Sequence, residues 1–158
     1  MDVSKFKPAT WLMVGGGLGM VIFGLFFDWA KLEVAGFDAG SGGNAFDWSR
    51  GWLSWILVVG VGVIAVLVAT GKLAAVKLPW NIIMVLATGL ATLLMLLLMI
   101  TGPDKSGVDF GRALGLWLAF ISTIASFVGA LMNFTGGGGD LKDLTDFKKI
   151  KGSFEQDS

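Results

Sequence analysis

Residues 78–103 read LPWNIIMVLATGLATLLMLLLMITGP and contain no charged side chain. A helix rises about 1.5 Å per residue, so roughly 20 residues cross a hydrocarbon core that is about 30 Å thick. Residues 8–27, 51–71 and 113–139 are free of charge in the same way. A soluble helix would carry a polar stripe on its wet side, and these stretches do not. The sequence therefore predicts an all-α membrane protein built as a four-transmembrane-helix bundle.

The predicted spans leave only short loops and tails, with no room for a separate soluble domain. We expect the spans at about residues 9–28, 51–71, 79–101 and 112–134. Residues 1–135 would form the bundle, and residues 136–158 a tail in which a Gly-rich joint precedes a short amphipathic helix. The centre of the long loop between the first two spans is rich in glycine and turn residues, which favours an irregular or mobile conformation of this loop in isolation.

Residue types that are missing from the sequence limit the reactions and binding sites that we expect. The chain has no Cys and no His, and therefore no thiolate or imidazole to act as metal ligand, nucleophile or general base. The charge-free stretches also lack the intramembrane ionisable groups on which ion-coupled transporters and proton pumps depend. The acidic residues of the first long loop lack the ligand spacing of a calcium-binding loop. We therefore expect no catalytic residues, no metal site and no cofactor.

The distribution of basic residues predicts the orientation. Eight of the twelve Lys and Arg residues lie in the two tails and in the loop between the second and third spans. The other two loops hold the remaining four, together with six of the twelve acidic residues. The positive-inside rule therefore places both termini in the cytoplasm, for a multi-pass protein of a bacterial plasma membrane.

Seven tryptophans lie near the ends of the spans. An indole is stable where apolar lipid meets water, so this pattern favours two interfacial belts over an aromatic ligand cage. Trp11 and Trp80 would lie at the cytoplasmic interface. The residues expected at the outer interface are Trp29, Trp48, Trp52, Trp55 and Trp117.

A short motif occurs twice before a span. Residues 46–51 read FDWSRG and residues 108–113 read VDFGRA, and a Trp follows four residues after each. The motif suggests two repeated helical hairpins, and the alternative is convergent use of the same helix-start chemistry.

Each copy of the motif places an Asp three residues before an Arg. The four residues concerned are Asp47, Arg50, Asp109 and Arg112. Asp47 or Ser49, and Asp109, are expected to cap the helices that follow, while the guanidinium groups reach lipid phosphate or pair with the carboxylates. Our first interpretation is that these four residues cap the helices and anchor them at the interface. The alternative is that they contact an anion or lipid headgroup on the outer face.

Small residues predict where the helices pack, because they let two backbones approach closely within lipid. The residues that this argument selects are Gly15, Gly19, Ala87, Ala91, Gly115, Ala119, Ser122 and Ser126. Those of the fourth span form a stripe, which we expect to face the small residues of the third span within one chain. The alternative is that the stripe joins chains in an oligomer.

The tail and the overall charge bear on partners. The basic residues that close the predicted tail helix, and that we expect at the inner leaflet, are Lys148, Lys149 and Lys151. The formal net charge of the chain is zero, which gives no reason to expect nucleic acid as a partner.

In layout the chain resembles the small uncharacterised four-helix membrane proteins of actinobacterial type, through its Trp-flanked first span and short acidic outer loop. That resemblance implies no activity. We expect a non-catalytic protein, an accessory or scaffold subunit of a membrane complex or a homo-oligomer, whose partners are the lipid bilayer and another membrane protein. The alternative is a passive small-solute or lipid carrier that works as an oligomer. A lipid enzyme using the two Asp–Arg pairs is the third hypothesis.

Overall fold

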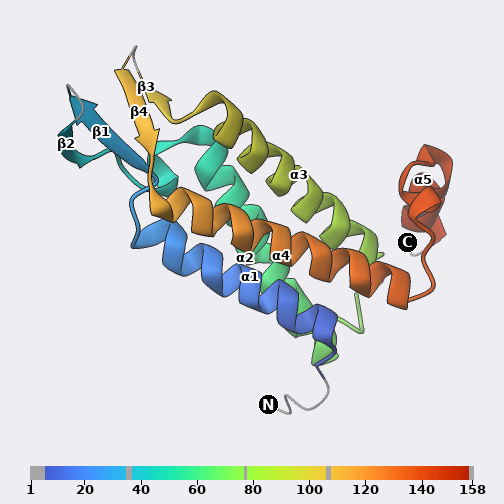
Figure 1. The fold of residues 1–158 in the computed structure, drawn as a ribbon. Helices are drawn as coiled ribbons and strands as arrows, with labels where there is room; N and C mark the ends of the chain where they lie inside the picture. The colour runs from blue at the N-terminus through green and yellow to red at the C-terminus, as the bar shows by residue number, and fades with distance from the viewer. Residues whose placement is uncertain (1–5, 35–36, 77, 106–107, 157–158) are drawn as a thin grey trace.

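Four long helices form an antiparallel bundle (Figure 1). The computed structural model describes residues 6–34, 37–76, 78–105 and 108–156. The helices are α1 (Pro8–Leu25), α2 (Ser49–Ala69), α3 (Trp80–Thr101) and α4 (Leu114–Gly136). Each is long and apolar enough to cross a membrane, so the predicted four-helix bundle of a membrane protein is confirmed. Lys5 and Lys77, which enter the predicted orientation, lie outside the described residues.

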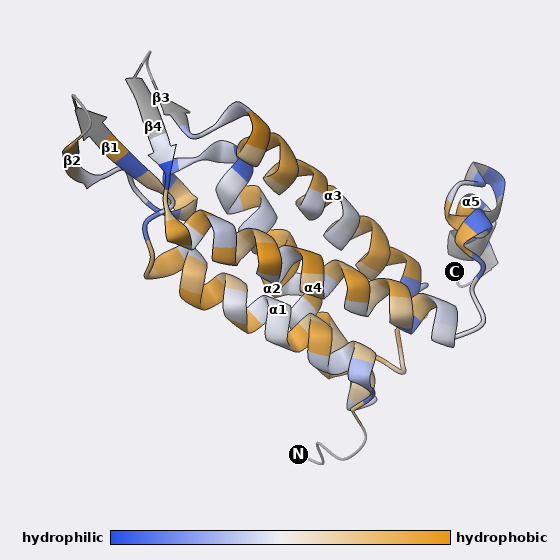
Figure 2. Ribbon diagram, viewed as in Figure 1, coloured by the Kyte–Doolittle hydropathy of each residue, from blue (hydrophilic) through white to orange (hydrophobic). Residues whose placement is uncertain are grey.

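The helices pack in a ring in which each makes its main contacts with two neighbours, and α2 and α4 also touch across it. The most extensive contact joins α1 and α4, and α2 and α3 complete the ring. The large side chains that are completely buried in the interior include Met13, Met20, Met84, Met95 and Leu116. Figure 2 shows hydrophobic residues along the length of the bundle and hydrophilic residues gathered towards its ends. This distribution is the one that a bilayer imposes on spanning helices.

A small antiparallel sheet lies at one end of the bundle (Figure 1). Its strands are β1 (Ala30–Val34), β2 (Phe37–Ser41), β3 (Asp104–Lys105) and β4 (Val108–Arg112), in the order β2-β1-β4-β3. We call this the sheet end, and the opposite end, where α1 begins and α4 finishes, the tail end. The first loop, which we expected to be irregular or mobile in isolation, is ordered in the folded chain, where β1 pairs with β2 and with β4 from the loop between α3 and α4.

Two of the tryptophans expected in a belt belong instead to the core beneath the sheet. Trp29 is completely buried, and its indole N–H donates to the carbonyl oxygen of Phe23 at 2.8 Å. Trp48 is 6% exposed and joins the same buried cluster. Trp52 and Trp117 are 41% and 49% exposed and are therefore placed as an interfacial belt requires.

The two copies of the repeated motif adopt different structures. Residues 46–51 span the 3₁₀ turn η2 (Ala45–Asp47) and the first residues of α2. Residues 108–113 instead form β4 and the residue before α4. The two segments therefore share a sequence pattern without sharing a local structure, and the repeat receives no structural support.

The tail forms two short helical elements, η3 (Leu141–Leu144) and α5 (Phe147–Gln156). The apolar spacing that begins at Leu141 suggests one continuous helix, but Asp146 interrupts it by accepting a hydrogen bond from the backbone N–H of Lys148 at 3.0 Å. Leu144 packs against the core at the tail end, close to α4. The tail is thus in contact with the bundle through η3.

Candidate functional site

Two arginines from different loops converge on the last turn of α3. Arg112 donates from Nε to the carbonyl oxygen of Met99 at 2.7 Å and from Nη2 to that of Ile100 at 3.2 Å. Arg50 donates from Nη1 to the hydroxyl of Thr101 at 3.2 Å. The last carbonyls of a helix have no partner within it and carry the negative end of its dipole, so cations are stabilised there.

The sequence places these arginines by two separate routes. Arg50 is the second residue of α2, and Arg112 is the last residue of β4. β4 is held by its pairing with β1, in which Ala30 lies opposite Arg112. α3 itself stops at Gly102, whose φ of 76° is a left-handed conformation that favours glycine. The sheet therefore fixes Arg112 beside the end of α3.

The expected caps of α2 and α4 were wrong. α2 has Trp48 at its N-cap position and α4 has Ala113, and neither position makes a side-chain capping hydrogen bond. Asp47 instead accepts a hydrogen bond from the backbone N–H of Asn44 at 2.8 Å, and thereby closes η2. Asp109 lies within β4, too far before α4 to serve as its cap.

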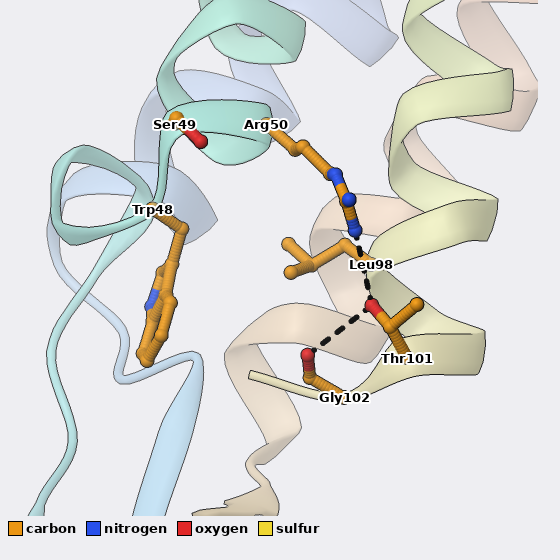
Figure 3. A pocket seen from close by; sticks show the side chains of 6 residues that line it. All are labelled: Trp48, Ser49, Arg50, Leu98, Thr101 and Gly102. Atoms are coloured by element: carbon orange, nitrogen blue, oxygen red, sulfur yellow. Dashed lines mark hydrogen bonds between the residues drawn. The ribbon is translucent and has the colours of Figure 1, made fainter. Parts of the chain in front are cut away.

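A hollow of about 350 Å³ lies beside Arg50 (Figure 3). Figure 3 shows the Trp48 indole on one side of it and Arg50, Leu98 and Thr101 on the other. The residues that line the hollow are Trp48, Ser49, Arg50, Leu98, Thr101 and Gly102. Its polar side chains include the Arg50 guanidinium and the Ser49 hydroxyl, which can donate hydrogen bonds. The Thr101 hydroxyl donates to the carbonyl oxygen of Leu97 at 2.8 Å and accepts from Arg50.

The hollow carries the positive charge of Arg50. Among the side chains that the structure describes, which do not include that of Asp104, no carboxylate oxygen lies within 4.0 Å of a nitrogen of Arg50. The guanidinium is always charged at neutral pH and offers five N–H donors in a planar fork. These donors are suited to an anion. The described residues likewise contain no group of three or more Asp or Glu side chains that could hold a metal ion.

The small-residue stripe of α4 faces α1, rather than α3 as the sequence suggested. A Cβ built at Gly129 would stand 2.7 Å from the carbonyl oxygen of Ala9, and one at Gly115 would stand 2.5 Å from that of Asp28. The predicted stripe residues Gly115, Ala119, Ser122 and Ser126 are all buried. The stripe thus lies inside the protomer.

The other predicted packing residues occupy different positions. Gly19 lies against the Ser122 side chain. Gly15 is exposed, and a Cβ added to it would meet no atom within 4 Å, so Gly15 makes no such contact within the protomer. Gly16 takes its place in the contact with α4. Ala91 faces α2, where its carbonyl oxygen accepts a hydrogen bond from Ser54 at 3.2 Å. Ala87 is half-buried near the core of the tail end.

Sequence reasoning missed one polar contact between helices. The side-chain amide of Asn133 on α4 donates to the side-chain oxygen of Asn81 on α3 at 2.7 Å. Both are amides in otherwise apolar spans, and that rarity is the signal that could have pointed to them.

The predicted lipid-contacting lysines belong to α5. Lys148 and Lys151 are exposed, and Lys151 pairs with Glu155 at 3.6 Å. The backbone of Lys149 lies in the same helix. An exposed pair of this kind contributes little to stability, so both ammonium groups remain accessible to other anions.

Comparison of the chain with protein-family models, with curated proteins and with solved structures finds no match.

Proposed function

We propose that this protein is a non-catalytic membrane subunit that uses the sheet at the end of its bundle as a platform for another membrane protein or a second copy of itself. The observation that carries this proposal is the sheet itself. Trp29 anchors it in the core, and strand pairing joins the two loops of that end into one unit. A loop that only connected two spans would need neither feature.

The surface of the sheet offers groups for such a contact. Phe37, the first residue of β2, is 77% exposed, although burial of an aromatic ring is strongly favourable. β2 pairs with β1 on one side, and no described strand pairs with its other edge. An open edge offers backbone hydrogen bonds to an added strand.

The carrier alternative finds less support in the interior. A polar route needs side chains that are available to a solute. The buried hydroxyls of Thr88, Ser122 and Thr123 donate instead to carbonyl oxygens of their own helices, at 2.7, 2.8 and 2.9 Å. Groups that are satisfied in this way contribute little to a polar path.

The orientation is part of the same proposal. The bundle gathers the N-tail, the loop between α2 and α3 and the C-tail at the tail end, and these segments carry eight of the twelve basic residues. Both termini would therefore lie in the cytoplasm of a bacterial cell, with the sheet on the other side of the plasma membrane.

The test is to purify the full chain in mild detergent and to measure both its mass and what co-purifies. A wild-type complex or oligomer is expected, and Phe37→Asp should dissociate it without lowering the melting temperature. Leu141→Asp, the same kind of substitution at a 53% exposed position at the tail end, is the matched control and should leave the assembly intact. A wild-type protein that is monomeric and alone under these conditions would refute the proposal.

A further inference from the structure

We infer that the hollow beside Arg50 binds a phosphate oxyanion, either that of a lipid headgroup or a free phosphate. The site consists of the guanidinium of Arg50, the hydroxyl of Ser49, and the space of about 350 Å³ that they line together with Trp48 (Figure 3). A space of this size is at the lower end of what small-molecule sites occupy. It is ample for a phosphate group.

The two arginines at the end of α3 have different tasks. Arg112 makes two hydrogen bonds to main-chain carbonyls there, so it neutralises the negative end of the helix. Arg50 makes a single hydrogen bond among the described residues, and its acceptor is an uncharged hydroxyl. Since Arg112 already satisfies the helix end, α3 does not require the charge of Arg50.

The remaining donors of Arg50 fit phosphate in particular. A guanidinium binds two oxygens of a phosphate or carboxylate with parallel N–H donors, and these bonds are about twice as strong as neutral ones. Ser49 lines the same hollow, and its hydroxyl adds a further donor. The start of α2, which has no side-chain cap, contributes positive potential on the same side.

The site lies at the depth in the membrane at which the phosphates of lipid headgroups lie. Arg50 lies in the first turn of α2, only two residues before the exposed Trp52. Exposed tryptophans at the ends of spanning helices mark the headgroup level. A headgroup phosphate and a phosphate ion from the aqueous side can therefore both reach the guanidinium.

The experiment uses the delipidated full-length protein and two readouts. The first is the melting temperature in detergent with sodium phosphate, against sodium chloride at the same ionic strength. The second is the lipid retained in native mass spectrometry after reconstitution with phosphatidylglycerol, against a neutral glycolipid without phosphate. Arg50→Gln should lower phosphate affinity or lipid retention roughly tenfold. Lys72→Gln removes an exposed charge at the tail end and should behave as wild type.

The outcomes distinguish three cases: the hollow binds a lipid headgroup, it binds a free phosphate ion, or it binds neither. A loss of phosphatidylglycerol retention in Arg50→Gln identifies the headgroup, and a loss of stabilisation by soluble phosphate identifies the free ion. Equal behaviour of wild type and Arg50→Gln in both readouts overturns the inference. If Arg50→Gln does not fold, Ser49→Phe fills the hollow and keeps the charge. That variant should also lose binding, and wild-type binding by it would overturn the inference equally.

Discussion

Gly16 of α1 lies directly against Ser126 of α4. A Cβ at residue 16 would stand 2.8 Å from the Cβ of Ser126 and 2.5 Å from the carbonyl oxygen of Ser122. Side-chain carbons do not approach each other or a backbone oxygen so closely, so this contact exists only because residue 16 is glycine. Its neighbour Gly15 faces open space. Two adjacent glycines thus have opposite roles.

The glycine pair gives the first prediction. Gly16→Ala should lower the free energy of unfolding by about 1–3 kcal/mol, because the added methyl group overpacks the contact between α1 and α4. Gly15→Ala should raise it by about 0.5–1 kcal/mol, because alanine favours the helix. Melting temperatures in the same detergent decide the matter. Equal shifts for both variants would show that the two helices do not meet at this face.

The second prediction concerns the anchor of the sheet. Trp29→Ala should cost about 3–5 kcal/mol, because it empties a fully buried site and removes the hydrogen bond to Phe23. Trp52→Ala, at a position that is 41% exposed, should cost much less. Limited proteolysis should cut the first loop faster in Trp29→Ala than in wild type. Similar stability and cleavage in the two variants would argue against a core role for Trp29.

The third prediction concerns the end of α3. Arg112→Gln should lower stability by about 1.5–3 kcal/mol, because two charge-assisted hydrogen bonds to main-chain carbonyls are lost. Arg112→Lys keeps the charge but not the planar fork, and should fall between wild type and Arg112→Gln. Thermal unfolding of the three proteins provides the measurement. A fully stable Arg112→Gln would mean that the α3 terminus needs no cation.

The fourth prediction concerns the amide pair between α3 and α4. A double-mutant cycle with Asn81→Ala and Asn133→Ala should give a coupling of about 0.6 kcal/mol, the average found for such hydrogen bonds in a membrane protein, and at most about 1.7 kcal/mol. Each stability is measured by thermal unfolding, and the coupling is the departure from additivity. Strictly additive losses would contradict a direct hydrogen bond.

The fifth prediction tests orientation. The chain has no Cys, so a single introduced thiol is unique. A thiol reagent that cannot cross membranes should label Phe37→Cys in intact cells and should leave Lys142→Cys unlabelled until the cells are opened. Both positions are exposed. Labelling in the reverse order would place the sheet in the cytoplasm.

The four spans of the bundle could be predicted because each is determined by the residues of its own segment. A run without charge, such as residues 78–103, identifies a span without reference to any other part of the chain. The partners of those spans could not be predicted in the same way. Loop length suggested that the stripe of α4 would face α3, whereas the closest approach is made by Gly16 and its neighbours on α1. Which face meets which helix depends on the whole ring.

The sheet and the arginine site could not be predicted from the sequence for the same reason. Leu32 becomes part of a sheet because Phe110 lies opposite it, in a loop that follows two intervening spans. The repeated motif selected Arg50 and Arg112 and predicted that their guanidinium groups would reach lipid phosphate or pair with the aspartates of the motif. Their described partners are at the end of α3 instead. A pattern within six residues cannot reveal such an acceptor.

The strand order has a consequence for biosynthesis. β1 is made early, between the first and second spans, but its partner β4 is made only after the third span has been inserted. Until then one edge of the β1–β2 hairpin has unpaired backbone groups, and a two-stranded hairpin alone is marginally stable. The late arrival of residues 108–112 closes that edge and brings Arg112 to the last turn of α3 at the same moment. The sheet at this end of the bundle therefore cannot be completed until the third span and the loop that follows it have been made.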